Sequence, residues 1–523
     1  MKRYSILSLT VLIYLLFSLP ASAQTYQYIP DSTFDGNGIK SFIYFNNIDR
    51  AYGCALQADQ KLVMAGLSKN PVTGSFELCV SRLNVNGDFD STFNNDGTCF
   101  ISMGPQQSIG GMTPKVKIAP DGKIIVINSG NSTGGANLDM MICRLDTNGF
   151  SDNSFNGNGV LFIDMTGTNT QPDGLNSVDI DANGNIWAAG VTRVGGTPLD
   201  NQLAVIKVTP SGQLDPSFDT DGKKLFDPTT SAEFGRGIKI QPDGKIVAAG
   251  KSGANMFVIR FDSTGALDNT FNSTGALTVQ FNLSSDIGAM DIDSQGRIIL
   301  GGQLVTSAAN VAVARILPSG AFDSNFGFNG KYTFNVGGQG SAITDIHVQS
   351  DNKIILGGYT EDSTGTTDFM ATRVDENGVI DITFNGLGFV KQSINSGSAN
   401  EEGNGMAVMS DGRIMMTGTI IISSAINEDI GVIRLLPVLS SGTGLEENNA
   451  EHSLATYPNP FSDRLVISSA GYAGTARLVD LSGRECLRFS IVHGYNSIDT
   501  RDLSPGMYLI YTEEGLSARV VRR

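Results

Sequence analysis

Carboxylates are the most plentiful ionisable groups in this sequence, and histidines are scarce. The 523 residues include 52 Asp and Glu, 36 Lys and Arg and 3 His. No serine-nucleophile, zinc-protease or phosphate-loop motif occurs, and His347 falls in an apolar, strand-like run where a packing role is expected. Glycoside hydrolysis needs only paired carboxylates, so this one reaction class stays open. We therefore expect no catalytic residues, with carboxylate catalysis on carbohydrate as the alternative.

Acidic residues that do not recur are the candidates for ligand binding. They lie in segments of variable length that are rich in Ser, Thr, Asn and Gly, where polar loops suit glycans or calcium better than apolar ligands. The candidates are Asp173, Asp200, Glu361, Asp362, Glu401 and Glu402. The alternative is that these loops vary because nothing constrains them.

A sequence repeat forms the scaffold that would carry these loops. A turn of the Asp-Gly-Lys type recurs seven times, from Asp59 to Asp411. An Asp-x-x-Phe-x-x-x-Gly segment also recurs seven times, with its Phe at 34, 93, 155, 218, 271, 326 and 384. A basic residue ends one apolar run in each unit, at 82, 144, 207, 260, 315, 373 and 434. Equivalent residues in every unit indicate structure: a Phe plug between units, an Asp turn cap and an ion pair.

Each unit contains four short apolar runs and no helical periodicity. In the fourth unit they cover residues 237–240, 245–249, 256–260 and 276–281. Four antiparallel strands repeated seven times predict an all-β chain with a seven-bladed β-propeller at residues 31–436. The first unit starts with a surplus strand at 39–45, and the last ends without its fourth strand. We expect residues 39–45 to pair beside residues 430–435 and close the ring.

The N-terminus has the pattern of a secretory signal peptide. Lys2 and Arg3 precede an apolar run, and Ala21-Ser22-Ala23 precedes Gln24. We predict a signal peptide at residues 1–23, a mature chain that begins at Gln24, and no transmembrane segment after cleavage. The formal net charge of −16 argues against a nucleic-acid partner.

Cysteine and metal signals are weak. Five cysteines are an odd number at irregular spacing, which leaves the disulfide status of Cys54, Cys79, Cys99 and Cys143 open. Loops such as residues 35–38 are similar to calcium loops but lack the acidic ligand that completes one. We expect no metal and no cofactor, with calcium as the alternative.

The end of the chain differs in composition from the repeats. Residues 437–452 are small, polar and acidic, as in a linker. Residues 453–523 contain short apolar runs near 465–468, 476–480, 486–492 and 507–511. We predict a small immunoglobulin-like β-sandwich there.

Both parts resemble known families. The run Ile-x-Pro-Asp-Gly-Lys-Ile, followed by the Asp-x-x-Phe segment, resembles the delta-60 repeat, found in secreted bacterial β-propellers. The third unit departs from this pattern at Asn183, Asn185, Trp187 and Lys207. The tail resembles the type A C-terminal sorting domain of the type IX secretion system of Bacteroidetes. The residues that carry this second resemblance are Tyr457, Pro458, Asn459, Pro460, Gly483, Arg484, Pro505 and Gly506.

The resemblances imply an exported protein that the type IX secretion machinery handles. It would be released, or attached to lipopolysaccharide at the outer-membrane surface. A cell-wall-binding module is the alternative for the tail. We expect a binding or adhesion module for an extracellular glycan or surface lipopolysaccharide, at the face that carries the variable loops. The alternatives are the carbohydrate-active enzyme and a structural surface protein without a specific ligand.

Overall fold

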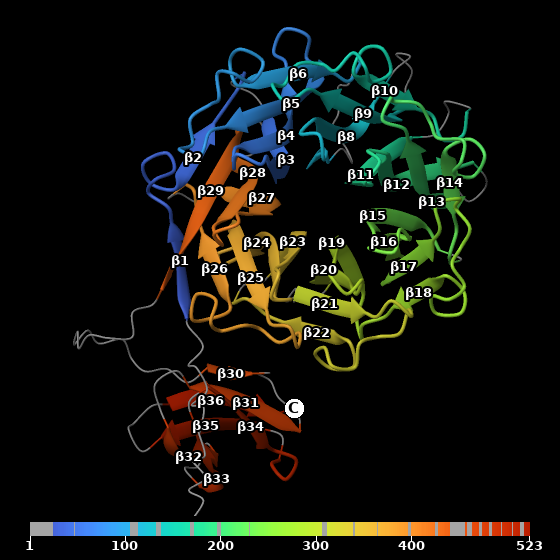
Figure 1. Ribbon diagram of the computed structural model, residues 1–523. Helices are drawn as coiled ribbons and strands as arrows, with labels where there is room; N and C mark the ends of the chain where they lie inside the picture. The colour runs from blue at the N-terminus through green and yellow to red at the C-terminus, as the bar shows by residue number, and fades with distance from the viewer. Residues whose placement is uncertain are drawn as a thin grey trace, which may run out of the picture. The chain divides into compact units, whose positions relative to one another are not determined.

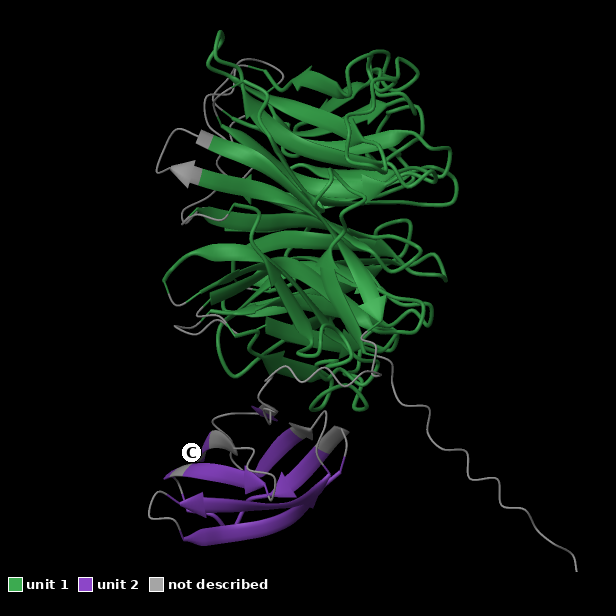
Figure 2. Cartoon of the chain, turned by 90° about the vertical axis from the view of Figure 1, so that its left-hand side faces the viewer, with its two compact units in different colours: residues 1–440 green, residues 441–523 purple. Residues whose placement is uncertain are grey.

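The chain forms two compact units, Met1–Ser440 and Ser441–Arg523 (Figure 2). The computed structural model describes residues 25–45, 48–104, 113–131, 137–167, 172–195, 200–229, 231–305, 311–337, 340–362, 364–395, 399–423, 427–439, 455–457, 463–469, 473–480, 484–492, 494–504, 506–512 and 517–522. The predicted signal peptide and most of the predicted linker lie outside these residues. Every element within them is a strand, and no helix there could cross a membrane.

Most strands of the first unit belong to four-stranded sheets in which each strand pairs with the next along the chain. We number these sheets 1 to 6 and call their strands a to d in chain order. Sheet 1 contains β3 (Asp49–Leu56), β4 (Leu62–Lys69), β5 (Phe76–Leu83) and β6 (Thr98–Ser102). Sheet 2 contains β7 (Lys115–Ile118), β8 (Ile124–Gly130), β9 (Asp139–Leu145) and β10 (Val160–Ile163). Sheet 3 contains β11 (Asp173–Ile180), β12 (Ile186–Val194), β13 (Asp200–Val208) and β14 (Lys223–Phe226). Sheet 4 contains β15 (Glu233–Ile240), β16 (Ile246–Ser252), β17 (Asn255–Phe261) and β18 (Ala276–Val279). Sheet 5 contains β19 (Ser285–Ile292), β20 (Ile298–Leu304), β21 (Val311–Ile316) and β22 (Lys331–Phe334). Sheet 6 contains β23 (Gly340–Val348), β24 (Ile354–Glu361), β25 (Thr367–Val374) and β26 (Phe389–Gln392).

A further sheet, sheet 7, joins the two ends of the first unit. Its strands a, b and c are β27 (Asn400–Val408), β28 (Ile414–Ser423) and β29 (Asn427–Leu439), and it also contains β1 (Tyr26–Pro30) and β2 (Ile39–Phe42). Both β2 and β1 pair with β29, through Phe42 opposite Ile430 and Tyr26 opposite Leu439. We expected strand c to end before Pro437, but β29 continues through it. The β28 pairing ends at Leu435, so the missing N–H of Pro437 interrupts no ladder on that side.

The sheets surround a common centre, and the a strands lie nearest to it (Figure 1). Strands b and c are almost wholly buried, and β8 and β9 are buried at every residue. Core clusters join neighbouring sheets, for example Val63 and Val80 of sheet 1 with Val126 of sheet 2. Because each sheet packs against others on both faces, its middle strands are continuous apolar runs. This is a β-propeller arrangement.

The repeated Asp, Phe and basic residue pack together, as the sequence predicts. In sheet 1, Arg82 Nε lies 2.7 Å from Asp90 Oδ2, and the guanidinium lies over the Phe93 ring at 4.9 Å. Asp90 also caps its turn by accepting the Thr92 N–H at 3.0 Å. Burial acts to raise the pKa of Asp90, but its hydrogen bonds and the charge of Arg82 outweigh burial and hold it well below its usual range.

A second repeated contact links each sheet to the next. The residue after the repeated Phe has a positive φ and donates its backbone N–H to the c–d turn of the following sheet, at 2.6–3.1 Å. The donors are Asp35, Asn94, Asn156, Asp219, Asn272 and Gly327, with acceptors at 86, 148, 211, 264, 319 and 377. Asn385 instead donates to Tyr26 O of β1 at 2.6 Å, because β29 does not turn where the other c strands do.

The β1 strand therefore takes the place of a c–d turn. In sheet 2, Gly149 of that turn lies over the Phe93 ring, where an added Cβ would come within 2.6 Å. In sheet 7, the Tyr28 ring contacts Phe384, with centroids 4.2 Å apart. We call the contacts of Tyr26 and Tyr28 with sheet 6 the N-terminal latch.

Cysteines have no cross-links in this fold. All five are free thiols, and Cys79, Cys99 and Cys143 are buried. Burial raises the pKa of Cys99 to about 11 and that of Cys54 to about 12. The thiols act as small apolar side chains.

The second unit contains two sheets. One consists of β30 (Ala455–Tyr457), β31 (Arg464–Ser469) and β34 (Gly494–Asp499); the other of β32 (Gly474–Asp480), β33 (Glu485–Ile491), β35 (Gly506–Thr512) and β36 (Ser517–Arg522). Leu465 and Ile467 of the first share a buried cluster with Leu478, Ile510 and Val520 of the second.

Candidate functional site

Two of the predicted ligand-binding carboxylates are buried inside the fold. Asp173 is 2% exposed and Glu401 is 0% exposed. Asp173 accepts the Met165 N–H at 2.8 Å and the Thr192 hydroxyl, and Glu401 accepts the Asn395 N–H at 2.7 Å. Burial raises the pKa of Asp173 to about 6. Both carboxylates bind backbone N–H groups of the segment that connects strand d to the next strand a. Asp49 does the same in sheet 1, where it accepts the Tyr44 N–H at 2.8 Å.

Three other predicted residues lie on different sheets and do not form one group. Asp200 begins β13 of sheet 3, and Glu361 ends β24 of sheet 6; both are half-buried. Asp362 accepts the backbone N–H groups of Thr364 at 2.7 Å and Thr366 at 3.0 Å. The Thr364 hydroxyl also donates to Asp362 at 2.7 Å, and this bond contributes most to lowering the pKa of Asp362.

Glu402, the sixth predicted residue, lies in a polar cluster on an inner strand. It is half-buried on β27, and its carboxylate accepts no hydrogen bond from any described residue. Burial raises its pKa; Arg50 opposes this effect and Glu428 adds to it. Burial, together with the charge of Glu402, also raises the pKa of Tyr359. Glu402 is therefore a partly desolvated acceptor among charged neighbours.

The neighbours of Glu402 are ordered by one ion pair. Arg50 of β3 binds Glu428 of β29 with both ends of its fork: Nε donates to Oε2, and Nη2 donates to Oε1 at 2.7 Å. The Arg50 Nη1 group also donates to the Tyr52 hydroxyl at 3.3 Å. The side chains of Arg50 and Glu428 are 32% and 12% exposed, so this pair is partly open to solvent.

Sequence reasoning missed Arg50, Tyr52, Tyr359 and Glu428. One signal was available: Glu402 lies two residues before the bulge residue of its strand a, and five other sheets place unlike residues at the equivalent position. These are Arg50, Gly174, Phe234, Asp286 and Ala342. Because the residue type varies at this position while the rest of the repeat is regular, the fold does not depend on it, and the side chains there are free to form a binding surface.

Polar and aromatic groups continue around the same end of the inner strands. Lys251 of sheet 4 lies 3.4 Å from Asp286 of sheet 5, and Gln303 accepts the Ile343 N–H of sheet 6 at 3.3 Å. Phe234 is 36% exposed. We name these side chains the rim band; its members are Arg50, Phe234, Lys251, Asp286, Gln303, Tyr359, Glu402 and Glu428. The band offers donors, acceptors and aromatic faces together.

Deeper charged groups on the a strands connect neighbouring sheets. Lys117 pairs with Asp179 at 2.9 Å, and Lys239 with Asp291 at 3.0 Å. Asp291 also accepts the Val348 N–H at 3.0 Å. Burial lowers the pKa of His347, which lies beside these charges. These groups stabilise the centre of the first unit, and the packing role expected for His347 fits them.

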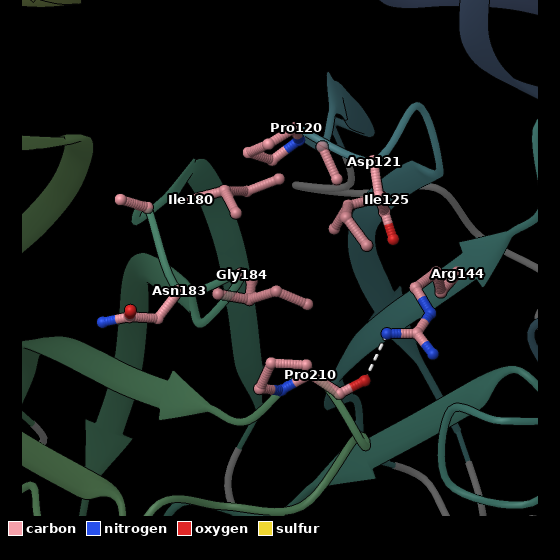
Figure 3. A pocket seen from close by; sticks show the side chains of 11 residues that line it. Pro120, Asp121, Ile125, Arg144, Ile180, Asn183, Gly184 and Pro210 are labelled. Carbon is pink, nitrogen blue, oxygen red and sulfur yellow. Dashed lines mark hydrogen bonds between the residues drawn. The ribbon is translucent and has the colours of Figure 1, made fainter.

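A separate cavity of about 210 Å³ opens between sheets 2 and 3 at the a–b turns, the end of the strands opposite the rim band (Figure 3). Its lining includes Ala119, Arg144, Pro210 and Asn183, one of the residues at which the third unit departs from the repeat. Another such residue, Trp187, is buried against Phe218, with centroids 5.1 Å apart. The departures therefore serve both packing and this cavity.

Some predicted sorting residues can be placed in the second unit. Tyr457 ends β30, Arg484 is exposed and pairs with Asp480 at 3.0 Å, and Gly506 begins β35. Pro458, Asn459, Pro460, Gly483 and Pro505 lie outside the described residues. Among the residues that the structure describes, no group of three or more His, Cys, Asp or Glu could hold a metal ion.

Comparisons with known families agree with both resemblances. Residues 455–522 match the secretion system C-terminal sorting domain, and residues 57–93, 119–155, 241–271 and 349–384 match a β-propeller domain of unknown function. The sorting domain marks the chain as secreted or cell-surface and indicates type IX export. No curated protein matches the chain.

Several solved structures have a similar course of the chain. Virginiamycin B lyase from Staphylococcus aureus is 12% identical, with a TM-score of 0.43 over 76% of this chain and 99% of that one. A protein of unknown function from Dyadobacter fermentans is 12% identical, with a TM-score of 0.40 over 64% and 98%. An ulvan lyase of polysaccharide lyase family 25 is 11% identical, with a TM-score of 0.42 over 75% and 95%. Likenesses at this level carry no argument about activity.

Proposed function

We propose that this exported propeller is a binding or adhesion module that contacts an extracellular glycan through its rim band. The observation that carries the proposal is Glu402, a partly desolvated carboxylate without a hydrogen bond from the described residues, next to the Arg50–Glu428 pair. An acceptor in this state gains most from a ligand that brings its own donors.

The architecture that we propose is a seven-bladed ring followed by an immunoglobulin-like sandwich. Sheets 1 to 7 supply the blades, and the pairing of β1 and β2 with β29 closes the ring. Two sheets around one core form the sandwich. In a closed ring all a strands begin at one mouth, so the rim band forms one continuous binding surface there.

Sugar chemistry suits the rim band. Hydroxyl groups can donate to Glu402 and accept from Arg50, while apolar sugar faces stack on aromatic rings such as Phe234 and Tyr359. Neighbouring positions around the mouth would bind successive units of a chain. Surface lipopolysaccharide is a second source of the same chemistry.

Carboxylate catalysis is the second candidate, because the same cluster holds two carboxylates in unlike environments. Glu428 is bound to Arg50, whereas Glu402 has a raised pKa from burial. Such a difference is what separates an acid from a nucleophile or base in glycosidases.

A glycan array probed with the mature full-length chain tests the proposal. Glu402→Gln keeps the shape and removes the charge, and should weaken binding of any retained glycan about tenfold or more. Glu361→Gln is the matched control and should bind as the wild type. Equal binding by Glu402→Gln, or no glycan retained at all, would refute this site. Release of reducing ends from a bound glycan would favour the enzyme.

A further inference from the structure

At one position of the a–b turn, the size of the side chain differs between the sheets. The residue that donates its N–H to close this turn is Gln57 in sheet 1 and Gln241 in sheet 4, bonded to Lys61 O and Lys245 O. Ala119 occupies the position in sheet 2, where it bonds to Lys123 O. The remaining sheets have Asp181, Asp293, Gln349 and Met409 there. Sheet 2 thus has the smallest side chain of all.

The glutamine amide fills a defined slot in sheets 1 and 4, whereas Gln349 Oε1 of sheet 6 has no hydrogen-bond partner among the described residues. Gln241 Oε1 accepts from Arg260 Nη1 at 3.3 Å, and its Nε2 donates to Gly296 O of the next sheet at 2.6 Å. Gln57 Oε1 likewise accepts from Arg82 Nη1 at 2.9 Å. The same Nη1 also donates to a backbone carbonyl at 2.5 Å in both sheets: Arg260 donates to Pro318 O, and Arg82 donates to Thr147 O. Arginine Nη1 has two N–H groups: one is bound by the backbone carbonyl, and the glutamine carboxamide binds the other.

The cavity at Ala119 has the same walls without the amide. Arg144 is the counterpart of Arg260, and Gly184, whose N–H bonds to Asp181 O as that of Gly296 bonds to Asp293 O, is the counterpart of Gly296. Both line the cavity of about 210 Å³ (Figure 3). Arg144 Nη1 donates to Pro210 O and has no second acceptor among the described residues. The donor and the neighbouring turn are in place, and the amide is missing.

We propose that this cavity binds a small neutral ligand through a primary carboxamide. The amide oxygen accepts from Arg144 Nη1, and the amide nitrogen donates toward Gly184, as the side chain of Gln241 does in sheet 4. Ile125, Ile180 and Pro210 surround the apolar part of the ligand. The site lies at the a–b turns, away from the rim band, and does not depend on the function proposed for the rim.

Charge favours an amide over a carboxylate in this cavity. The Arg144 side chain is 7% exposed and is already neutralised by Asp152, 2.8 Å from its Nε. Asp121, which is exposed, contributes a further negative charge to the lining. A carboxylate also has no N–H for the Gly184 turn, so propionate should bind much more weakly than propionamide.

Ligand-observed NMR titration of the full mature chain with propionamide tests the site. We expect saturable binding below about 100 mM, the range of weak fragments, with propionate at least about tenfold weaker. N-acetylglucosamine separates primary amides from acetamido sugars, because its amide nitrogen has only one N–H. Stronger binding of the sugar than of propionamide would overturn the assignment to a primary amide.

Two substitutions use the internal comparison. Ala119→Gln supplies the amide from the chain and should abolish binding while keeping or raising the thermal midpoint. Ala266→Gln, in the exposed c–d turn of sheet 4, is the control and should still bind. Gln241→Ala opens the corresponding slot in sheet 4 and should raise the stoichiometry from about one to about two. Unchanged propionamide binding by Ala119→Gln would place the ligand outside this cavity, and no binding by the wild type would show that the cavity holds only water; either result would overturn the proposal.

Discussion

The N-terminal latch provides the sharpest test of how the first unit holds together. Tyr28 is 5% exposed, contacts the Phe384 ring at 4.2 Å, and donates its N–H to Asn385 Oδ1 at 3.0 Å. Tyr28→Ala removes the ring but leaves the backbone bonds in place. Truncating a buried aromatic residue costs about 3–5 kcal/mol, and the exposed edge beside β1 allows some collapse. We expect a loss of about 3 kcal/mol.

Urea unfolding of the mature full-length chain, followed by tryptophan fluorescence, measures this loss. The single tryptophan, Trp187, lies in sheet 3, far along the chain from the latch. If the seven sheets unfold together in one cooperative transition, the urea midpoint measured by Trp187 fluorescence should fall together with the midpoint measured by circular dichroism. Tyr28→Phe keeps the ring and should unfold near the wild-type midpoint. An unchanged midpoint for Tyr28→Ala, or a loss at sheet 7 that leaves the Trp187 transition in place, would refute the latch.

Three further predictions address the core, the capping carboxylates and the tail. Gly288 is the bulge residue of β19, where an added Cβ would lie 1.6 Å from Ile343 O; Gly288→Ala should cost about 3 kcal/mol or more in urea unfolding, and Gly195→Ala, with no atom within 4 Å, should cost little. Burial raises the pKa of Asp173 to about 6, above its unfolded value, so its contribution to stability is present below about pH 4 and is lost as the pH rises to about 6. Over that range the wild type should lose about 2–3 kcal/mol relative to Asp173→Asn, and parallel pH profiles would contradict this reasoning. Removal of residues 453–523 should leave the first unit folded but retained in the periplasm, as measured by cell fractionation and protease resistance, and normal surface display would contradict it.

The sequence was sufficient for features that are local and repeated. The Arg82, Asp90 and Phe93 contacts lie within a dozen residues and recur at the equivalent residues of sheets 2, 4, 5 and 6, so type and spacing specify them. The all-β fold and the propeller repeats followed from the same regularity, and the sorting domain followed from the resemblance of the tail to a known family.

Features that depend on distant contacts could not be predicted from the sequence. The Arg50–Glu428 pair joins residues 378 positions apart, and β1 is a five-residue strand whose partner lies at the other end of the unit. Pro437 locally resembles the end of a strand, and only the end of the β28 pairing at Leu435 shows that its missing N–H interrupts no ladder there. Asp173 and Glu401 resemble loop acids until the backbone groups that they cap are known.

The antiparallel pairing of Tyr26 with Leu439 sets the order of events during synthesis and export. The chain emerges from its N-terminus, so β1 waits with an unpaired edge until β29 has been made, about 400 residues later. Bringing ends this far apart together costs only about 5 kcal/mol, because loop entropy grows with the logarithm of length. Until then Tyr26 and Tyr28 remain exposed to chaperones and to other chains. The last strand of the unit and the residues that lead into the sorting domain are thus made together. A chain cut short before residue 427 would therefore have neither a complete sheet 7 nor a sorting domain.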